Sequence, residues 1–358
     1  MKDRKLHFYP FIYLKMAIGN RFNYLLIDAS YILTRNLFIA TKDKKPEEMN
    51  PGEVCRITIQ TISKLYKDWF CSGDKPILIF DEWSRNLGGY IRSFMIKDFV
   101  AYKGSRKFMT QALLNEMRED PNVTPEELVK AEHELAVNKC KFEAKKIMKE
   151  QFRQIGIPCF SFEGYEYDDI AALASFIFSE PTSKPNVIVT KDSDLNYSLS
   201  PGTCQFLVPT KGKEPEFVYY DDMYYKIPQV LRDRGVSLYM YHAYCDSLGV
   251  TGHNDNLKTI KKGADGTQAI LHILDGDYSD VENIPAFEAQ MRSFDLSNFP
   301  DLDKVQSMII NDFPKAGHIG TIPEFRAFCT RNNITGISDS YYMAFSDRLD
   351  QRLFSEGI

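Results

Sequence analysis

The alternation of apolar and polar positions along the chain predicts short buried strands separated by helices. Four apolar runs have the length and composition of strands, and they lie within 23–30, 75–83, 155–166 and 184–195. Helical spacing or helix-forming composition marks three intervening segments, 31–40, 55–70 and 108–155. A helix-start signal stands at Thr124-Pro125-Glu126-Glu127. This order predicts an α/β fold whose mainly parallel central sheet is flanked by helices.

Acidic residues gather where these predicted strands end. Three strands lead into aspartates, and the stretch EGYEYDDIAALASFIF (163–178) places further acids in the first turn of an apolar helix. The acids concerned are Asp28, Asp81, Glu166, Asp168, Asp169, Asp192 and Asp194. Each one alone could be a turn former or a helix cap, but the carboxyl ends of parallel strands meet at one edge of a sheet. Converging carboxylates without His or Cys suit the hard cations Mg²⁺ and Mn²⁺.

Composition places the chain among globular proteins. It has 358 residues, of which 44% are hydrophobic and 26% charged, and this excludes disorder as the main theme. Seven cysteines without CxxC spacing indicate reduced thiols rather than a disulfide framework or a zinc site. Pro10 and Lys15 interrupt the apolar stretch near the N-terminus. No window approaches the roughly 20 apolar residues of a membrane span. We therefore expect a cytoplasmic protein with no membrane partner.

Charge is unevenly distributed along the chain. The net charge is −5, yet six basic residues face one acid, Asp98, between positions 85 and 107. The basic residues are Arg85, Arg92, Lys97, Lys103, Arg106 and Lys107. A basic stripe in an acidic protein is expected where an anionic substrate meets one face beside metal-binding acids.

The segment 241–274 contains a second candidate contact for nucleic acid. Asp246 and Asp255 are followed by three lysines, a turn and an apolar helix. The residues of this element are Lys258, Lys261, Lys262, Gly263 and Gly266. Backbone N–H groups and lysines at such a turn can hold a phosphodiester backbone without reading its sequence. An ordinary loop between two helices would have the same composition.

Taken in order, these motifs resemble the 5′–3′ exonuclease and flap endonuclease superfamily, in particular its bacteriophage members of the ribonuclease H and 5′-exonuclease type. The resemblance spans roughly residues 24–275. LLIDASYILTR resembles the first-strand motif, with Asp28 and Arg35, and IFDEWSR resembles the second acid motif at Asp81. YKGSR resembles the arch motif, GYEYDDIAA the E-x-D-D motif, and VTKDSDL the D-x-D motif. The segment after Asp246 resembles the helix–hairpin or helix–three-turn–helix element that grips duplex DNA.

Two features depart from the family pattern. Phage and bacterial members have Gly-Asp, then two residues, then Asp-Asn. Here Cys245 stands in place of the glycine, and residues 247–254 separate Asp246 from Asp255-Asn256. The glycines of the hairpin are also spaced as GADG. These departures concern the last metal ligand and the duplex clamp, and they leave the other acids unchanged.

The resemblance implies two-metal hydrolysis of phosphodiester bonds. One Mg²⁺ would be held by Asp28, Asp81, Glu166 and Asp168. The second would be held by Asp169, Asp192, Asp194 and Asp246, together with Asp255. Mn²⁺ could substitute for either ion, and the two ions would activate water and stabilise the leaving oxygen.

Basic and aromatic side chains complete the implied site. Lys103 and Arg106 would neutralise the scissile phosphate, and Tyr102 would stack on an unpaired base. Further contacts to DNA are expected from Arg35, Arg85, Arg92, Lys107, Lys258, Lys261, Lys262, Gly263 and Gly266. The implied substrates are DNA with a 5′ flap, a nick or an RNA primer, and the implied role is in replication. Replication proteins such as single-strand-binding protein are candidate partners. A phage-encoded chain would act in the host cytoplasm.

The predicted organisation has four parts. Residues 1–20 form an N-terminal extension, and residues 21–225 form the catalytic α/β domain, with a basic helical arch at 84–155. Residues 226–300 form the helical element for duplex DNA, and residues 301–358 form a C-terminal helical tail.

Three other interpretations stay open. A PIN-type ribonuclease shares an acid-edged sheet but is normally shorter. A haloacid-dehalogenase-type phosphatase expects an aspartate two residues after the first, whereas Ala29 and Ser30 follow Asp28. A non-catalytic, structure-specific DNA-binding protein would result if the altered Asp246 region no longer bound metal.

Overall fold

The computed structural model describes residues 22–70, 74–98, 109–154, 158–180, 184–208, 214–250, 258–313 and 321–346. Five of the predicted site residues, Tyr102, Lys103, Arg106, Lys107 and Asp255, lie outside these described residues.

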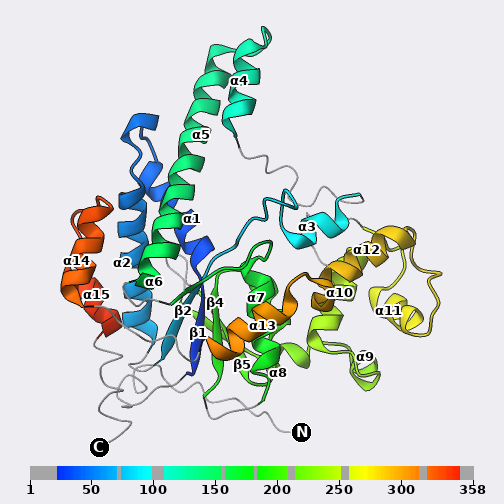
Figure 1. The fold of residues 1–358 in the computed structure, drawn as a ribbon. Coiled ribbons are helices and arrows are strands. Elements are labelled where there is room, and N and C mark those ends of the chain that lie inside the picture. The colour runs from blue at the N-terminus through cyan, green and yellow to red at the C-terminus, as the bar shows by residue number, and fades with distance from the viewer. Residues whose placement is uncertain are drawn as a thin grey trace, which may run out of the picture.

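A six-stranded sheet forms the centre of the molecule (Figure 1). Its strands, in spatial order, are β3 (Cys159–Phe160), β2 (Lys75–Ile79), β1 (Tyr24–Asp28), β4 (Asn186–Thr190), β5 (Thr203–Leu207) and β6 (Glu216–Tyr219). The first five are parallel, and β6 pairs antiparallel with β5. The predicted α/β fold with a mainly parallel sheet is therefore confirmed.

Side chains that alternate along the strands build two separate cores. Leu25 and Ile27 of β1 point to one face of the sheet, and Leu26 points to the other. This alternation follows from the two-residue period of a strand. Both faces are covered, so the strands are apolar throughout, as is usual for parallel sheets.

Helices from both ends of the chain cover the face that contains Leu25. They are α1 (Ala29–Thr41), α2 (Pro51–Trp69), α5 (Pro125–Lys146), α14 (Ile322–Arg331) and α15 (Asp339–Ser346). A π-helical turn, Ile147–Gln151, and the short α6 (Phe152–Gln154) continue α5. Phe328 of α14 and Tyr342 of α15 are fully buried, and the hydroxyl of Ser63 in α2 donates a 2.9 Å hydrogen bond to the carbonyl of Tyr341. The C-terminal helices are thus part of this layer.

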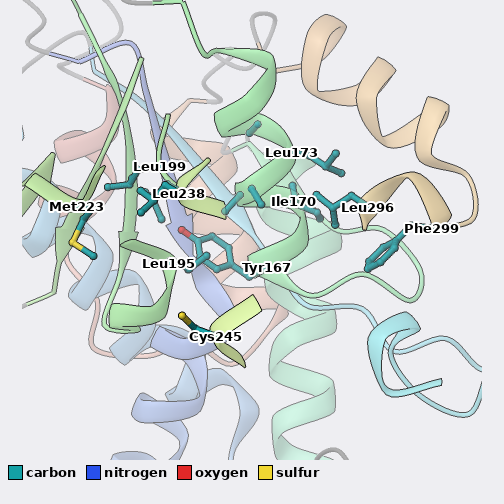
Figure 2. Packing of buried hydrophobic residues seen from close by; sticks show 14 of the residues in the cluster. Tyr167, Ile170, Leu173, Leu195, Leu199, Met223, Leu238, Cys245, Leu296 and Phe299 are labelled. Carbon is teal, nitrogen blue, oxygen red and sulfur yellow. The ribbon is translucent and has the colours of Figure 1, made fainter. Parts of the chain in front are cut away.

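The opposite face packs against the helices that follow the acidic motifs. They are α7 (Tyr167–Ile177), α8 (Tyr220–Tyr224), α9 (Gln229–Asp233), α10 (Leu238–Leu248), α11 (Gly266–Leu274), α12 (Ile284–Phe294) and α13 (Leu302–Asn311). Two 3₁₀ helices, η4 (Ser193–Ser198) and η5 (Leu296–Asn298), belong to the same layer. Figure 2 shows Ile170 and Leu173 of α7 among the side chains of this core. The predicted helical element at 226–300 therefore shares one hydrophobic core with the sheet.

A helical hairpin projects from the body of the molecule (Figure 1). It consists of α4 (Gln111–Glu119) and the first half of α5. The predicted helix-start signal caps α5, because Thr124 Oγ1 accepts from the Glu127 amide while the Glu127 carboxylate accepts from the Thr124 amide. Short helices η2 (Pro46–Glu48) and α3 (Ile91–Ile96) lie before the hairpin in the chain. None of the helices in the described ranges is long and apolar enough to cross a membrane.

Candidate active site

An acid-lined cavity of about 330 Å³ lies at the carboxyl edge of the sheet. It is formed where β1, β2 and β4 end and where α7 begins. Its lining residues are Asp28, Tyr31, Asp81, Glu166, Tyr167, Asp168, Thr190, Lys191 and Asp192. The structure therefore brings together five of the predicted acids, which are separated by up to 164 positions in the sequence.

Asp28 is the most constrained acid in this cavity. It ends β1 and caps α1, and its side chain accepts from the Tyr31 amide at 2.8 Å and from the Thr190 hydroxyl at 3.1 Å. Burial raises the pKa of Asp28 to about 7, and the negative charges of Asp81 and Asp192 contribute further to the rise. The two hydrogen bonds that Asp28 accepts therefore do not offset its burial and the neighbouring negative charges.

Asp81 and Glu166 are fixed by the turn at the start of α7. The Tyr167 amide donates a 2.8 Å hydrogen bond to Asp81 Oδ1, and the Asp81 amide donates to Ser30 Oγ at 2.8 Å. Glu166 is the N-cap residue of α7 and is buried. The acids of the second strand and of α7 are thus joined directly through the helix N-terminus, which favours negative charge.

Asp192 enters the cavity from the loop after β4. Its Oδ1 accepts from the Asp194 amide at 3.0 Å, and its own amide donates to Thr190 Oγ1 at 3.2 Å. Because the Thr190 hydroxyl donates to Asp28, this threonine holds both acids in place. Asp192 is exposed, so little of the fold depends on its side chain.

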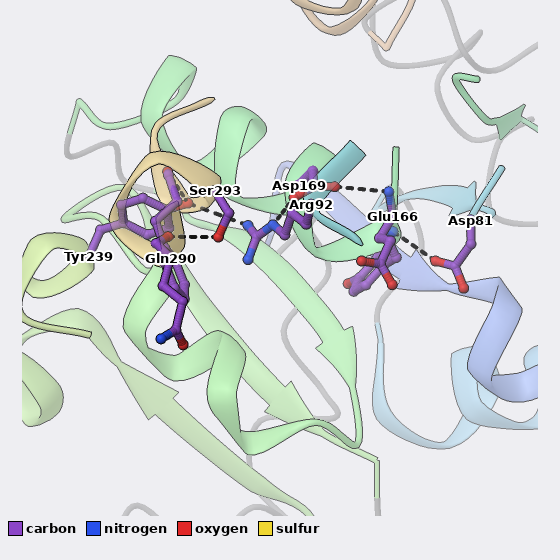
Figure 3. A network of polar contacts seen from close by, with 9 residues as sticks. Asp81, Arg92, Glu166, Asp169, Tyr239, Gln290 and Ser293 are labelled. Atoms are coloured by element: carbon purple, nitrogen blue, oxygen red, sulfur yellow. Dashed lines mark hydrogen bonds and ion pairs between the residues drawn. The ribbon is translucent and has the colours of Figure 1, made fainter. Parts of the chain in front are cut away.

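Asp169 does not line the cavity, although it follows Asp168 directly. It is fully buried, and its Oδ1 lies 2.6 Å from Nε of Arg92 (Figure 3). Its Oδ2 accepts from the Glu166 amide at 2.9 Å. The predicted metal ligand Asp169 and the predicted DNA contact Arg92 therefore contact each other, away from the lining of the cavity. Together they form a buried ion pair that supports the turn carrying Glu166.

Asp194 and Asp246 lie outside the lining of the cavity. Asp194 lies in the first turn of η4, and Asp246 is a buried residue of α10. Between these elements, the Tyr197 ring stacks on the His242 ring. The structure therefore brings η4 and α10, which carry these two acids, into contact, while Asp255 lies outside the described residues.

The donors of the cavity fit a hard divalent cation. In the part of the chain that the structure describes, no group of three or more His, Cys, Asp or Glu side chains is already arranged to hold a metal ion. The cavity nevertheless collects five carboxylates, and the raised pKa of Asp28 reflects its own burial and the repulsion from Asp81 and Asp192. A cation among them would remove this repulsion, and Mg²⁺ or Mn²⁺ would be bound through carboxylate oxygens and water.

The basic residues predicted to contact DNA are partly described. Arg35 of α1 and Arg85 after β2 are exposed. Lys258, Lys261 and Lys262 are also exposed. The predicted turn is present, because the Ala264 amide donates to the Lys261 carbonyl at 3.2 Å and Gly263 has φ of 87°. Gly266 is the first residue of α11, whose N-cap is Asp265.

Four residues near the acids were not identified from the sequence. Lys191, Thr190 and Tyr31 line the cavity, and Nζ of Lys145 donates a hydrogen bond to the carbonyl of Asp81. Burial lowers the pKa of Lys145. Lys191 stands directly before Asp192, so its proximity to the acids could have been inferred. Lys145 reaches Asp81 because the end of α5 packs against the sheet, and no local sequence pattern indicates this packing.

Comparisons with known proteins give structural likenesses alone. No family model matches the sequence, and no curated protein matches it. The chain is similar to T5 5′-exonuclease with bound zinc, with a TM-score of 0.41 and 17% identity over 92% of this chain and 99% of that one. It is also similar to a bacteriophage T5 D15 flap endonuclease complex with DNA and metal ions (TM-score 0.39, 15% identity, 92% and 100% covered). A third similar structure is the catalytic core of Rad2 with a DNA substrate (TM-score 0.39, 14% identity, 92% of each chain).

Proposed function

We propose that this chain is a divalent-cation-dependent 5′ nuclease that hydrolyses phosphodiester bonds in DNA. The observation that supports this best is the convergence of five carboxylates, from four separate segments of the chain, on one cavity at the carboxyl edge of a parallel sheet. Ligand sites of open α/β sheets form at this edge. A cavity that gathers so many acids without His or Cys is suited to cations rather than to an anionic substrate alone.

The first cation would be held by the five acids that line the cavity, Asp28, Asp81, Glu166, Asp168 and Asp192. A second cation would be held in part by Asp194 and Asp246. When bound, such ions supply a water activated for attack and charge stabilisation for the leaving oxygen. The side chains of the protein keep the carboxylates oriented. Thr190 bonds to Asp28, and the Tyr167 amide bonds to Asp81. Pre-formed hydrogen bonds of this kind remove the cost of ordering the ligands on each turnover.

Positive charge beside the acids would bind the substrate phosphate. Lys191 is exposed at the rim of the cavity. We include Lys103 and Arg106 in the same role, and Tyr102 in stacking on an unpaired base, on the strength of their motif. Substrates with a 5′ flap, a nick or an RNA primer, and a role in replication, belong to this proposal through the same resemblance.

A cleavage assay with Mg²⁺ or EDTA tests the proposal. The substrates are a 5′-labelled flap, a nicked duplex, a 3′ flap and an RNA–DNA hybrid. We expect wild-type protein with Mg²⁺ to release short 5′ products. We expect Asp192→Ala to lower turnover by several orders of magnitude, because a cation ligand is lost while the fold is kept. Asp192→Asn should behave in the same way, because asparagine can still accept from the Asp194 amide but carries no charge.

The matched control is Asp303→Ala, which removes an exposed acid of α13. It should cleave like the wild type. Cleavage in EDTA, or normal cleavage by both Asp192 variants, would contradict the proposed cation chemistry. Binding of the flap without any cleavage would favour a structure-specific DNA-binding protein, and preference for RNA alone would favour a PIN-type ribonuclease.

A further inference from the structure

A pair of stacked rings lies where η4, which carries Asp194, meets α10, which carries Asp246. The centroids of the Tyr197 and His242 rings are 4.6 Å apart, and their planes differ by 2°. Tyr197 belongs to η4 and His242 to α10, so the stack joins the loop after β4 to the helical layer. His242 is buried, and the Phe294 ring packs against it edge-on at 5.5 Å. The stack is therefore held from a third element as well.

Each ring stands one helical turn from an acid. Asp194 precedes Tyr197 by three residues, and residues at i and i+3 of a 3₁₀ helix lie above one another. Asp246 follows His242 by four residues, and residues at i and i+4 of an α-helix share a face. The distance from His242 Nε2 to Asp246 Oδ2 is 3.8 Å. Stacking the two rings therefore brings the two acid-bearing faces together.

The surroundings of the Tyr197 hydroxyl agree with this geometry. Burial raises the pKa of Tyr197, and the negative charges of Asp194 and Asp246 add to the effect. Both acids thus act on the same phenol. Two carboxylates on separate elements repel each other when no cation lies between them. A rigid apolar contact that resists this repulsion would keep them available to a cation.

We propose that Tyr197 and His242 are positioning residues. Their stack holds Asp246 beside Asp194 and so completes the binding site of the second cation. This inference rests on the proposed function. It gives the altered Asp246 region a physical role, because the stack fixes Asp246 from its own helix and from η4. The stack requires no glycine before Asp246, where this chain has Cys245.

A Mn²⁺ binding titration tests the proposal without reference to activity. Bound Mn²⁺ is measured as the loss of the electron paramagnetic resonance signal of the free ion. The full chain is titrated as wild type, Tyr197→Leu and Tyr197→Phe. We expect wild type to bind two ions. Tyr197→Leu should weaken one of them roughly 10- to 100-fold, as is typical when the support of a metal ligand is lost, and should leave the other unchanged. Tyr197→Phe keeps the ring and should bind both ions within about twofold of wild type.

Circular dichroism shows whether each variant is folded. If Tyr197→Leu does not fold, His242→Gln removes the same contact from the other element and should show the same selective loss. Binding of both ions with wild-type affinity by the folded variant that lacks the stack would overturn the positioning role alone. An equal loss in Tyr197→Phe would overturn it too, because the ring would then be irrelevant. Wild-type protein that binds fewer than two ions would overturn this inference, and wild-type protein that binds none would overturn the proposed function with it.

Discussion

Burial decides the different roles of the adjacent acids Asp168 and Asp169. Asp168 lines the cavity, whereas Asp169 is buried against Arg92. Successive residues of a helix point in directions about 100° apart, and the side chain of Asp169 is turned toward Arg92 instead of the cavity. The E-x-D-D pattern specifies which residue types occur, but the rotation of α7 and the partner 77 positions away decide which acid meets the cavity. The sequence alone therefore predicts that acids gather here, but it does not predict which of them line the cavity.

Arg92→Met should destabilise the fold rather than weaken DNA binding directly. Its side chain is 14% exposed, and loss of its charge would leave the buried Asp169 carboxylate without a countercharge. Removing one member of a buried ion pair costs about 3–5 kcal/mol. Urea unfolding measures this loss. Arg85→Met, at an exposed site, is the control and should change stability by less than about 0.5 kcal/mol.

The double variant Arg92→Met with Asp169→Asn distinguishes the ion pair from simple packing. It should recover part of the loss, because no unpaired charge then remains buried. Unchanged stability in Arg92→Met, together with weaker binding of DNA, would instead restore Arg92 to the DNA contact predicted from its position in the basic stripe.

Asp28→Asn should stabilise the cation-free protein. The pKa of Asp28 is raised to about 7 by burial and by Asp81 and Asp192, so its charged form opposes folding above that pH. Asparagine keeps an acceptor for the Tyr31 amide and removes the charge. At pH 8 in EDTA we expect a gain on the order of 1–3 kcal/mol, measured by thermal unfolding, together with a loss of cleavage. A destabilised variant would show that the carboxylate contributes hydrogen bonds worth more than its repulsion.

Among the elements, those with strong periodicity or clear end signals were predictable. β1, β2 and β4 coincide with apolar runs, and α5 begins at its predicted capping box. β5 and β6 were not predicted, because TCQFL and EFVY are short and mix polar with apolar residues. β3 is shorter than its apolar run indicates, with two residues. It pairs with β2 at the edge of the sheet, and pairing partners rather than local pattern set its length.

The predicted arch at 84–155 has three electrostatic parts. Basic residues predominate before the helical hairpin and again after residue 134, whereas residues 111–134 contain seven acids and two bases. The acids are Glu116, Glu119, Asp120, Glu126, Glu127, Glu132 and Glu134. The tip of the hairpin would therefore repel a phosphodiester backbone. The description of the arch as basic therefore applies to its two ends and not to the tip of the hairpin.

Lys97→Ala and Lys130→Ala test this division. Lys97 is exposed after α3, beside the predicted arch motif, and Lys130 is exposed on the acidic hairpin. Lys97→Ala should weaken flap binding and lower the slope of log K against log salt by about 0.9, as expected for one lost phosphate contact. Lys130→Ala should leave both quantities unchanged. Fluorescence anisotropy over a salt series measures them, and the reverse order of effects would place the DNA on the hairpin.

At the scale of the molecule, the acids of the site come from strands and helices that belong to both layers. Asp28 caps α1 on one face of the sheet, while Glu166 begins α7 on the other. A cation bound among these carboxylates would connect the elements that carry them. Without the cation, the repulsion between the carboxylates lowers the stability of the protein. The apolar pattern could predict the layers, because a strand that is buried on both faces is apolar at every position. It could not predict the balance of charge at their junction, which depends on three-dimensional distances.

This connection predicts that cations stabilise the whole fold. A ligand that binds only the native state, at a free concentration about 100 times its dissociation constant, adds about 2.7 kcal/mol to the free energy of unfolding. Wild-type protein should therefore melt at a higher temperature in Mg²⁺ or Mn²⁺ than in EDTA, as measured by differential scanning calorimetry. Asp28→Asn should begin from a higher temperature in EDTA and gain much less from the cation, because a ligand charge is gone. Asp303→Asn, which alters an exposed acid away from the cavity, should gain as much as the wild type. An equal gain in all three proteins would mean that the cations act on general surface charge, and the carboxyl edge of the sheet would then have no special affinity for them.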